Sequence, residues 1–440
     1  VHVKVKAMGE MKSLRVDTQA NLNAMYELQG FFFSLNSEAQ SVDLKADRVK
    51  GQSFRIYLNT GRSRRVMMMD IPPDVVLYSP VTEMALRRLK PGQEISIRTL
   101  DPAMLLDPER LSTAPVTLKA LRKETLELKG QKYETLVISS QFQGMTSTTW
   151  IDMNGETIRQ ETPLGWAMEK CTIDEAFEAL RLSEKSDDML AGLAVPCKGR
   201  MADPRGSRQF KLLLRGVVFP PGELASNRQI VEKIEGPETW LTVKAAEAPG
   251  PDARRPAAWL GDGGPAPKEF KPYLASSMNL QASHPQIVAK AREIVGAETD
   301  PMEKASRIFT WVYRNVTKEM TVSLPSALDV LQTMKGDCNE HTYLFVALAR
   351  AAGLPARIHV GLAHHKGAFY YHAWPSVYVG DWLEMDPTWG QPAVDATHIA
   401  LVEGEMASQV RLVKVIGQLK IEVLEETLKK ANGQQPAETP

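Results

Sequence analysis

The sequence predicts an α+β protein in which a β-rich N-terminal part precedes a domain of helices packed on an antiparallel sheet. In residues 1–200, short segments rich in Val, Ile, Thr and aromatic residues alternate with Gly, Pro, Asp and Asn, as is typical of strands and turns. Between 245 and 268, five prolines and four glycines exclude a long helix or a central strand. From residue 269 onward, the apolar residues recur first at helical and then at strand spacing.

The composition is that of a folded chain with more than one domain. A length of 440 residues exceeds one ordinary domain of about 150 residues. A hydrophobic content of 43% with 24% charged residues excludes a mostly disordered chain. Because 53 basic residues balance 53 acidic ones, we expect no phosphate-binding surface for nucleic acid. No apolar run approaches the length of about 18 residues that a membrane span requires, so we expect none.

Strands are expected throughout residues 1–200, which form a β-rich N-terminal domain. The strongest candidates are Ser53–Asn59, Val75–Tyr78, Glu94–Arg98, Pro115–Leu121, Glu134–Ser140 and Thr146–Met153. Asn154-Gly155 is a hairpin signal, whereas helix and strand both fit Ala20–Phe33. Since no ligand cluster, phosphate loop or nucleophile motif occurs here, we expect a structural or substrate-presenting role. A β-rich connecting region, 201–244, leads into the Pro/Gly-rich linker, 245–268.

The domain expected over 269–425 contains four helices and then a sheet. The first helix covers His284–Val295, and the second begins with Asp300 as N-cap and Pro301 at the first helical position. Gly353 and Pro355 end the fourth helix. The third and fourth helices and the strands that follow are Ser326–Met334, Cys338–Ala352, Ala356–Ala363, Phe369–Val379, Trp382–Asp386 and Gln409–Val423. Residues 426–440 form a polar tail.

Cys338 lies where a loop enters the fourth helix, after Gly336-Asp337. A cysteine in the first helical turn faces the positive end of the helix dipole and unpaired backbone N–H groups. Both favour thiolate over thiol, so we expect a pKa below the free value of about 8.5. Taken alone, a cysteine is also consistent with a small buried apolar residue.

Two further residues would complete a catalytic group. His372 lies within a predicted strand, and Asp386 lies in the next strand. A cysteine nucleophile needs an imidazole that takes and returns a proton, and the imidazole needs a carboxylate that sets its tautomer. The order Cys338, His372, Asp386 supplies all three.

These residues belong to longer motifs: Gly336-Asp337-Cys338-Asn339-Glu340-His341, the segment 347–357, His372-Ala373-Trp374 and Asp386-Pro387-Thr388-Trp389. Together the motifs resemble the transglutaminase-like superfamily of papain-like folds, over about residues 270–425. The resemblance implies that Cys338 is the nucleophile, His372 the general base and acid, and Asp386 the orienting carboxylate. It implies acyl transfer to an amine or to water through a thioester, on protein or peptide substrates. The N-terminal part resembles, more loosely, the domain that precedes this module in many exported bacterial proteins.

Two features depart from the family pattern. Many relatives carry Glu two residues after the motif tryptophan, where this chain has Ser376 after Trp374. The spacing of 14 residues between His372 and Asp386 is one shorter than is common.

The short spacing bears on the strand register. A two-residue loop at Gly380-Asp381 would place His372 and Asp386 on opposite faces of the hairpin. We therefore predict a three-residue loop or a β-bulge between them. Pro375, which cannot donate to the ladder, is the favoured position for a bulge.

A metal site is an alternative use of these histidines. Cys338 and His341 are three residues apart on one helix and could bind a metal with His364 and His365. Structural zinc takes four ligands, and catalytic zinc three with water. Because no second cysteine is nearby, we expect no metal and no cofactor.

Other residues near the motifs could assist the reaction. Gln332, six residues before Cys338, is placed like the oxyanion-hole glutamine of papain-like proteases, or is simply an exposed residue of the third helix. The backbone N–H of Cys338 is the other candidate donor. We expect Trp374 and Trp389, which with Trp382 lie near the triad in sequence, to pack around it and exclude water.

Cys171 and Cys197 are the natural disulfide pair, which leaves Cys338 as the free thiol. Spacing alone does not establish the geometry of a bridge, so a pair of free thiols stays an alternative. A bridge would fit an oxidising compartment. We expect an exported protein, periplasmic or extracellular, whose signal peptide is not part of this sequence.

The sequence therefore predicts a bacterial enzyme that performs acyl transfer or amide hydrolysis through a Cys338 thioester. Two alternatives from other classes remain. One is a binding module that keeps the fold and has lost turnover. The other is a metal-dependent hydrolase, which would require one metal ion per chain.

Overall fold

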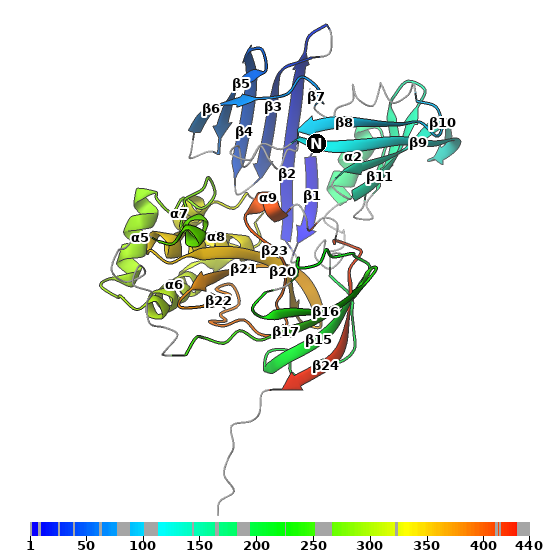
Figure 1. Cartoon of the computed structure of the whole chain (residues 1–440). Coiled ribbons are helices and arrows are strands. Elements are labelled where there is room, and N and C mark those ends of the chain that lie inside the picture. Colours follow the sequence, from blue (N-terminus) through cyan, green and yellow to red (C-terminus); the bar gives the residue numbers. More distant parts are fainter. Residues whose placement is uncertain are drawn as a thin grey trace, which may run out of the picture. The chain divides into compact units, whose positions relative to one another are not determined.

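The computed structural model describes residues 2–7, 10–24, 27–37, 40–60, 64–76, 89–100, 113–142, 145–162, 167–182, 194–224, 226–250, 266–321, 324–409, 412 and 415–428 (Figure 1). The chain divides into two compact units. One contains Val1–Gly192, Met320–Leu324 and Val413–Gly417, and the other contains Leu193–Glu319, Pro325–Leu412 and Gln418–Pro440. Most of the expected linker (251–265) and most of the expected tail (429–440) lie outside the described residues.

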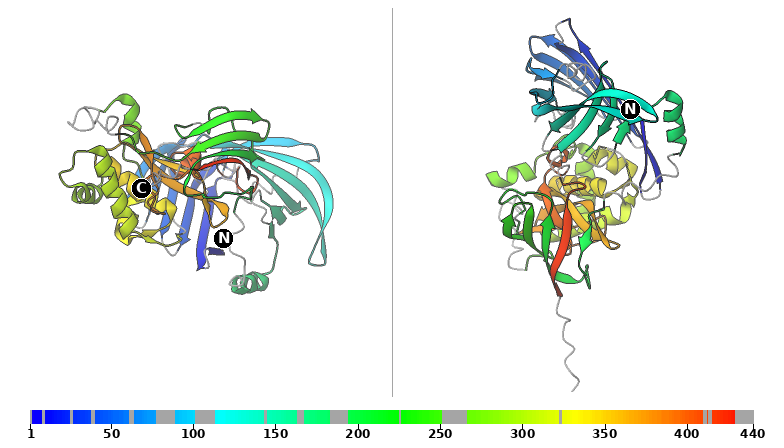
Figure 2. Two further views of the ribbon diagram at one scale, coloured as in Figure 1. Left: turned by 90° about the horizontal axis from the view of Figure 1, so that it is seen from below. Right: turned by 90° about the vertical axis from the view of Figure 1, so that its right-hand side faces the viewer.

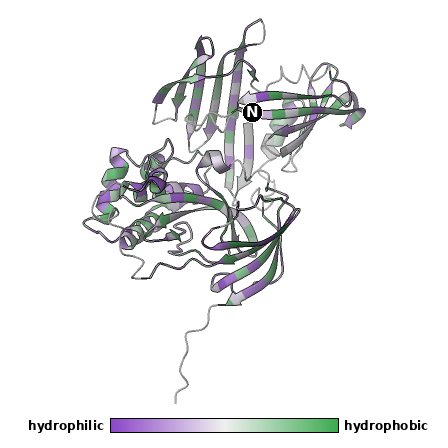
Figure 3. Cartoon of the chain, in the orientation of Figure 1, coloured by the Kyte–Doolittle hydropathy of each residue, from purple (hydrophilic) through white to green (hydrophobic). Residues whose placement is uncertain are grey.

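The first unit begins with a six-stranded antiparallel meander. Its strands, in sheet order, are β1 (His2–Ala7), β2 (Glu10–Leu22), β3 (Leu28–Ser37), β4 (Ser41–Lys50), β5 (Ser53–Asn59) and β6 (Arg64–Asp70). The ambiguous segment Ala20–Phe33 forms parts of β2 and β3, because the two strands pair with each other. Along β5, Phe54, Ile56 and Leu58 are buried and the residues between them are exposed. Figure 3 shows this alternation of apolar and polar residues along the strands.

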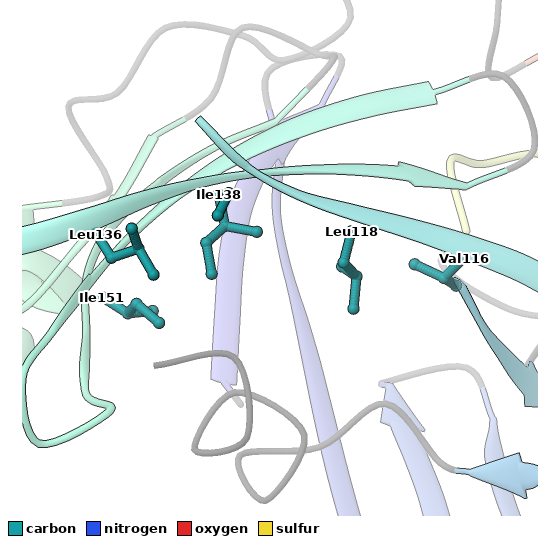
Figure 4. Packing of buried hydrophobic residues seen from close by; sticks show 6 residues of the cluster. Val116, Leu118, Leu136, Ile138 and Ile151 are labelled. Atoms are coloured by element: carbon teal, nitrogen blue, oxygen red, sulfur yellow. The ribbon is translucent and has the colours of Figure 1, made fainter. Parts of the chain in front are cut away.

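A seven-stranded sheet follows in the same unit. In sheet order it contains β13 (Ala167–Glu169), β12 (Thr157–Glu161), β11 (Met145–Asp152), β10 (Gln131–Phe142), β9 (Thr113–Leu128), β8 (Glu94–Leu100) and β7 (Val75–Val76), with helix α2 (Ile173–Leu182) after β13. The core of this sheet (Figure 4) comprises Val116, Leu118, Ala120, Leu136, Ile138 and Ile151.

All six segments predicted as strands contain strands in these two sheets. The last two residues of Val75–Tyr78 lie outside the described residues, so only Val75–Val76 is confirmed there. Asn154-Gly155 lies between β11 and β12, which pair in antiparallel fashion. Gly155 has a φ of 88°, a conformation that glycine adopts without steric cost.

The second unit contains a five-stranded sheet made from both ends of its sequence. In sheet order the strands are β14 (Cys197–Lys198), β24 (Lys420–Leu428), β15 (Ser207–Arg215), β17 (Glu238–Lys244) and β16 (Gln229–Glu235). Figure 2 shows β24, in red, beside the green strands. The strands expected as a connecting region, 201–244, thus belong to the same compact unit as the helices described next. The domain boundaries expected from the sequence, at residues 200, 244, 268 and 425, stay a prediction.

The strand predicted over Gln409–Val423 is wrong in extent and partner. Gln409 ends the short helix α9 (Met406–Gln409), and the strand β24 begins at Lys420. The reason is long-range burial: Ile421 lies opposite Leu214 of β15, and both are buried. Pairing with β15 covers an apolar side chain that local sequence could not assign to a partner.

The remaining elements confirm the four predicted helices and position the site. After the 3₁₀ helix η4 (Lys268–Tyr273) come α5 (Pro285–Val295), α6 (Pro301–Asn315), β18 (Thr317–Lys318), α7 (Ala327–Thr333), β19 (Lys335–Gly336) and α8 (Cys338–Ala351). A four-stranded sheet then forms in the order β22 (Trp382–Glu384), β21 (Ala368–Tyr378), β20 (Ala356–His365) and β23 (Ile399–Glu403). Figure 1 shows α5–α8 gathered beside this sheet.

Helix α8 is the centre of this layer. It packs on β20 and β21 and also contacts α5, α6 and α7. Every residue from Glu340 to Ala349 is buried, as expected of a helix that is surrounded on all sides. Among the described residues, the helices are all too short or too polar to cross a membrane.

Candidate active site

Cys338 is held at the first position of α8 by its neighbours. The Asp337 carboxylate accepts a hydrogen bond from the Asn339 N–H at 2.9 Å, and the Glu340 carboxylate accepts one from the Asp337 N–H at 2.9 Å. This reciprocal capping box determines where the helix begins. Gly336 permits it, because a Cβ atom there would lie 2.2 Å from Cβ of Glu340.

The register of the β21–β22 hairpin decides whether the other two candidates can meet. Ser376 lies opposite Glu384, and the ladder ends at a loop of three residues, 379–381. The predicted three-residue loop is therefore confirmed. The ladder between β20 and β21 runs through Pro375 without a bulge. His372 and Asp386 consequently face the same side of the sheet.

His372 and Asp386 form a buried hydrogen bond. Nε2 of His372 lies 2.9 Å from Oδ2 of Asp386, and the two side chains are 4% and 0% exposed. Oδ1 of Asp386 accepts hydrogen bonds from the N–H groups of Thr388 (2.8 Å) and Trp389 (3.1 Å). Burial raises the pKa of Asp386, but its interactions with His372 and His398 outweigh burial and hold that pKa well below its usual value. Asp386 is thus an ionised acceptor, and Nδ1 of His372 is the ring nitrogen left for a thiol.

Aromatic rings pack around the imidazole of His372. The Trp389 ring stacks on it with centroids 4.1 Å apart, and the Trp374 ring lies nearly parallel at 6.1 Å. Trp382 is not part of this group, since its ring packs near those of Tyr273 and Tyr378. The expected packing of Trp374 and Trp389 around the imidazole is what the structure contains.

The expected low pKa of Cys338 is contradicted. Burial raises the pKa of the thiol well above its usual value, and the carboxylates of Asp337, Glu340 and Asp386 add to the rise. The backbone N–H of Ala373 acts on the sulfur in the opposite direction. The helix-start effect is outweighed first by burial of the sulfur and then by the capping carboxylates that stand beside it. The surroundings of the sulfur therefore favour the thiol over the thiolate.

The two oxyanion candidates differ in placement. Gln332 is exposed on α7, and its amide donates to Oε1 of Gln286 at 3.0 Å. This placement does not support Gln332 as an oxyanion donor, because surface exposure and a local partner on α5 take the amide away from the thiol. The N–H of Asn339 is capped by Asp337, whereas the N–H of Cys338 contacts no acceptor in the described part of the chain. It is therefore available to a developing oxyanion.

The structure adds His398 and its hydrogen-bond partner Asp395, which the motifs did not reveal. His398, directly before β23, is fully buried, with Nε2 3.4 Å from Oδ2 of Asp386 and Nδ1 3.2 Å from Oδ1 of Asp395. A density of six histidines among the eight of the chain, all between 341 and 398, was the available sequence signal. That density does not distinguish a working histidine from a packed one.

The histidines of the alternative metal site are engaged elsewhere. The two ring nitrogens of His341 lie 2.7 Å and 3.3 Å from the backbone oxygens of Asp337 and Val316. His364 and His365 pack against the rings of Phe369 and Trp389. These contacts leave His341 with no ring nitrogen facing a metal shared with Cys338.

Another trio has the spacing of metal ligands. The ligand atoms of His372, Asp386 and His398 lie within 4.8 Å of one another. All three side chains are buried, and each is hydrogen-bonded to another member of the trio. A cation would have to displace the protons that these bonds contain, so we interpret the trio as a proton-holding cluster.

Cys171 and Cys197 are free thiols in this structure, and the disulfide between them stays a prediction that thiol counting on unreduced protein tests. Cys171 is exposed before α2 in the first unit, and Cys197 lies in β14 of the second unit. Closeness in sequence does not supply the Cα and Cβ geometry of a bridge.

Comparison with known proteins gives the following. Residues 288–387 match the family model of the transglutaminase-like superfamily. An uncharacterised protein of Haemophilus influenzae is 37% identical over 86 residues, which cover 18% of this chain and 23% of that protein. Mouse kyphoscoliosis peptidase is 28% identical over 142 residues, covering 27% of this chain and 21% of the peptidase. The chain therefore spans less than a quarter of either relative.

A solved structure, the periplasmic domain of TgpA from Pseudomonas aeruginosa, aligns with a TM-score of 0.25 and 18% identity. The alignment covers 42% of this chain and 89% of that domain. The predicted fold class is confirmed: antiparallel sheets with few helices precede a papain-like core in which helices pack on an antiparallel sheet.

Proposed function

We propose that this chain, whose residues 288–387 are a transglutaminase-like domain, catalyses acyl transfer or amide hydrolysis on protein or peptide substrates through a Cys338 thioester. The observation that carries the proposal is the arrangement of Cys338, His372 and Asp386 in the fold. In support of it, α8 packs on β21, His372 and Asp386 share one face of the sheet and a hydrogen bond, and the backbone N–H of Ala373, next to His372, acts on the Cys338 sulfur.

The chemistry follows from the protonation states. Because the Cys338 thiol is neutral at rest, its proton moves to Nδ1 of His372 as the sulfur attacks the amide carbonyl. Asp386 stabilises the imidazolium that forms and keeps Nε2 protonated. The oxyanion of the tetrahedral intermediate accepts from the Cys338 N–H. His372 then protonates the leaving amine, which leaves the acyl group on sulfur.

In the second half of the reaction, His372 acts as the base toward the acyl acceptor. The same imidazole, neutral again, removes a proton from an amine or a water molecule as it attacks the thioester. An amine gives transamidation, and water gives hydrolysis. The tryptophan that stacks on His372 at 4.1 Å covers one face of the imidazole, so solvent reaches the base from fewer directions.

The test supplies a peptide or protein amide with and without a fluorescent primary amine. We expect either amine incorporation or release of the leaving amine by the wild-type chain, and neither by Cys338→Ala or His372→Ala. Acid quenching followed by peptide mapping is expected to find the acyl group on Cys338. Turnover that survives Cys338→Ala would refute the proposal.

A second candidate, a binding module without turnover, is favoured by one observation: the environment of Cys338 opposes the thiolate. It predicts retention of the peptide by both wild type and Cys338→Ala with no acyl group on sulfur. Export, periplasmic or extracellular, belongs to the proposal as well. Fractionation of cells that express the natural gene checks it, and a chain found entirely in the cytoplasm would contradict it.

A further inference from the structure

His398 is placed between two buried carboxylates. Its Nε2 lies 3.4 Å from Oδ2 of Asp386 and its Nδ1 lies 3.2 Å from Oδ1 of Asp395, and the side chains are 0%, 0% and 5% exposed. An ionised carboxylate only accepts hydrogen bonds, and a neutral imidazole has one donor and one acceptor nitrogen. A neutral His398 would therefore direct a lone pair at a carboxylate oxygen. The geometry requires two donors, which only the imidazolium provides.

We propose that His398 is a positioning residue: a permanently protonated imidazolium that shares Asp386 with His372 and keeps His372 neutral and ready to take the thiol proton. The inference rests on the proposed function. It concerns how the carboxylate acts on the base, and His398 itself touches neither thiol nor substrate.

The surroundings hold His398 in place from three sides. Asp395 accepts from the N–H and the hydroxyl of Thr397, from the amide of Gln391 at 2.9 Å, and pairs with Arg205 at 3.4 Å. On the backbone side, Arg228 donates to the carbonyl of His398 at 3.1 Å. The ring therefore cannot turn away from Asp386 without breaking contacts at both nitrogens.

The charges around the ring explain its effect. Asp386 and Asp395 face it directly, and His372 lies beyond Asp386 with ring centroids 5.8 Å from those of His398. Arg228 is paired with Glu384, and the half-exposed Arg205 acts on Asp395 from the far side. Lys318 interacts more weakly with Asp386.

The positive charge of His398 acts on the carboxylate that it shares with His372. With His398 charged, part of the negative charge of Asp386 is already neutralised, so Asp386 stabilises the imidazolium of His372 less strongly. Burial lowers the pKa of His398, but its hydrogen bonds to the two carboxylates outweigh burial and raise it. A neutral base is what a neutral thiol requires, since an imidazolium could not accept the proton of Cys338.

The first test is the pH dependence of kcat/KM for wild type and His398→Gln. Gln keeps one donor for Asp386 and removes the positive charge. A like charge nearby disfavours the charged form of a titrating group, so removing the positive charge of His398 is expected to move the acid limb up by about one pH unit. At pH 6 the variant is then about tenfold slower than wild type, and at pH 8 the difference largely disappears. His284→Gln, at the N-cap of α5 and outside the cluster, is the control and leaves the profile unchanged.

A purely structural role for His398 gives a different result: the rate falls by the same factor at every pH and the acid limb stays in place. That outcome overturns the inference.

The second test needs neither turnover nor a change at position 398. In Cys338→Ala protein labelled with ¹⁵N-histidine, we expect both ring nitrogens of His398 to remain protonated from pH 6 to pH 8. One unprotonated nitrogen at pH 7 overturns the inference, and so does loss of both N–H signals with one equivalent of zinc. Failure of the proposed function is distinguishable, because inactive wild-type protein would still contain the doubly protonated ring.

Discussion

Replacing Arg228 tests the network that supports the site from the neighbouring sheet. Its guanidinium pairs with Glu384 while the two side chains are 5% and 1% exposed, and it donates to the backbone oxygens of Lys244 and His398. Burial raises the pKa of Glu384, but the charge of Arg228, the first of the opposing contributions, brings it to about 2. A carboxyl whose pKa falls from 4.5 to about 2 has its charged form stabilised by about 3 kcal/mol.

Arg228→Met therefore leaves a buried carboxylate without its partner, which typically costs about 3–5 kcal/mol. Urea unfolding of the full chain, followed by tryptophan fluorescence, measures the loss. Trp374 is a local reporter because its Nε1 donates to Glu384 at 2.7 Å. Removing both charges, in Arg228→Met with Glu384→Gln, is expected to cost less than the sum of the single changes.

The pH dependence has a definite sign. Glu384 has a lowered folded-state pKa, so its contribution to the free energy of unfolding is complete above about pH 4.5 and is lost as the pH falls toward 2. The difference between wild type and Arg228→Met should shrink over that window. The exposed pair Lys233–Glu235 is the control, and Lys233→Met should cost less than about 1 kcal/mol. A loss below about 1 kcal/mol for Arg228→Met, or additive single and double variants, would refute the reasoning.

Three further predictions concern the site. Gly336→Ala introduces a Cβ 2.2 Å from that of Glu340 and so disrupts the capping box. The variant should lose about 1–2 kcal/mol of stability and should show a changed alkylation rate of Cys338. If stability and alkylation rate were both unchanged, the capping argument would be contradicted. Asp386→Asn removes the acceptor of the His372 proton, so kcat should fall by at least about 100-fold with little change in fold; a smaller loss means that the carboxylate does not act on the base. Iodoacetamide alkylation of Cys338, mapped by peptide analysis, should have a pH midpoint above the free-thiol value of about 8.5. The reason is that burial and the capping carboxylates raise the pKa of this thiol. A midpoint near pH 6 would instead indicate a preformed thiolate–imidazolium pair.

Much of the site follows from local rules applied to the sequence. Asp337 and Glu340 define a helix start, and that start places Cys338. The second rule is the alternation of side chains along a strand. It allows His372 and Asp386 to share a face only if the hairpin loop has an odd number of residues or a strand contains a bulge. The three-residue loop satisfies this condition. Such arguments succeed because each depends on residues a few positions apart in the chain.

The remaining features depend on which side chains approach through space. The strand expected over Gln409–Val423 does not join the sheet of β20 to β23. Its C-terminal part belongs to β24, which pairs with β15 because Ile421 and Leu214 are buried opposite each other. Gln332 points to α5 and not to the thiol. No local pattern distinguishes such partners, since they come from elements far apart in sequence.

The sequence by itself determined the order of the candidate residues Cys338, His372 and Asp386, the helix that begins at Cys338, and the strand face that His372 and Asp386 share. Only the tertiary structure decided the protonation state of that thiol and the presence of His398 beside Asp386. The physical reason is that capping and strand parity act over one or two turns of the chain. Desolvation and the field of buried charges are sums over everything that packs nearby, and those neighbours exist only once the chain has folded.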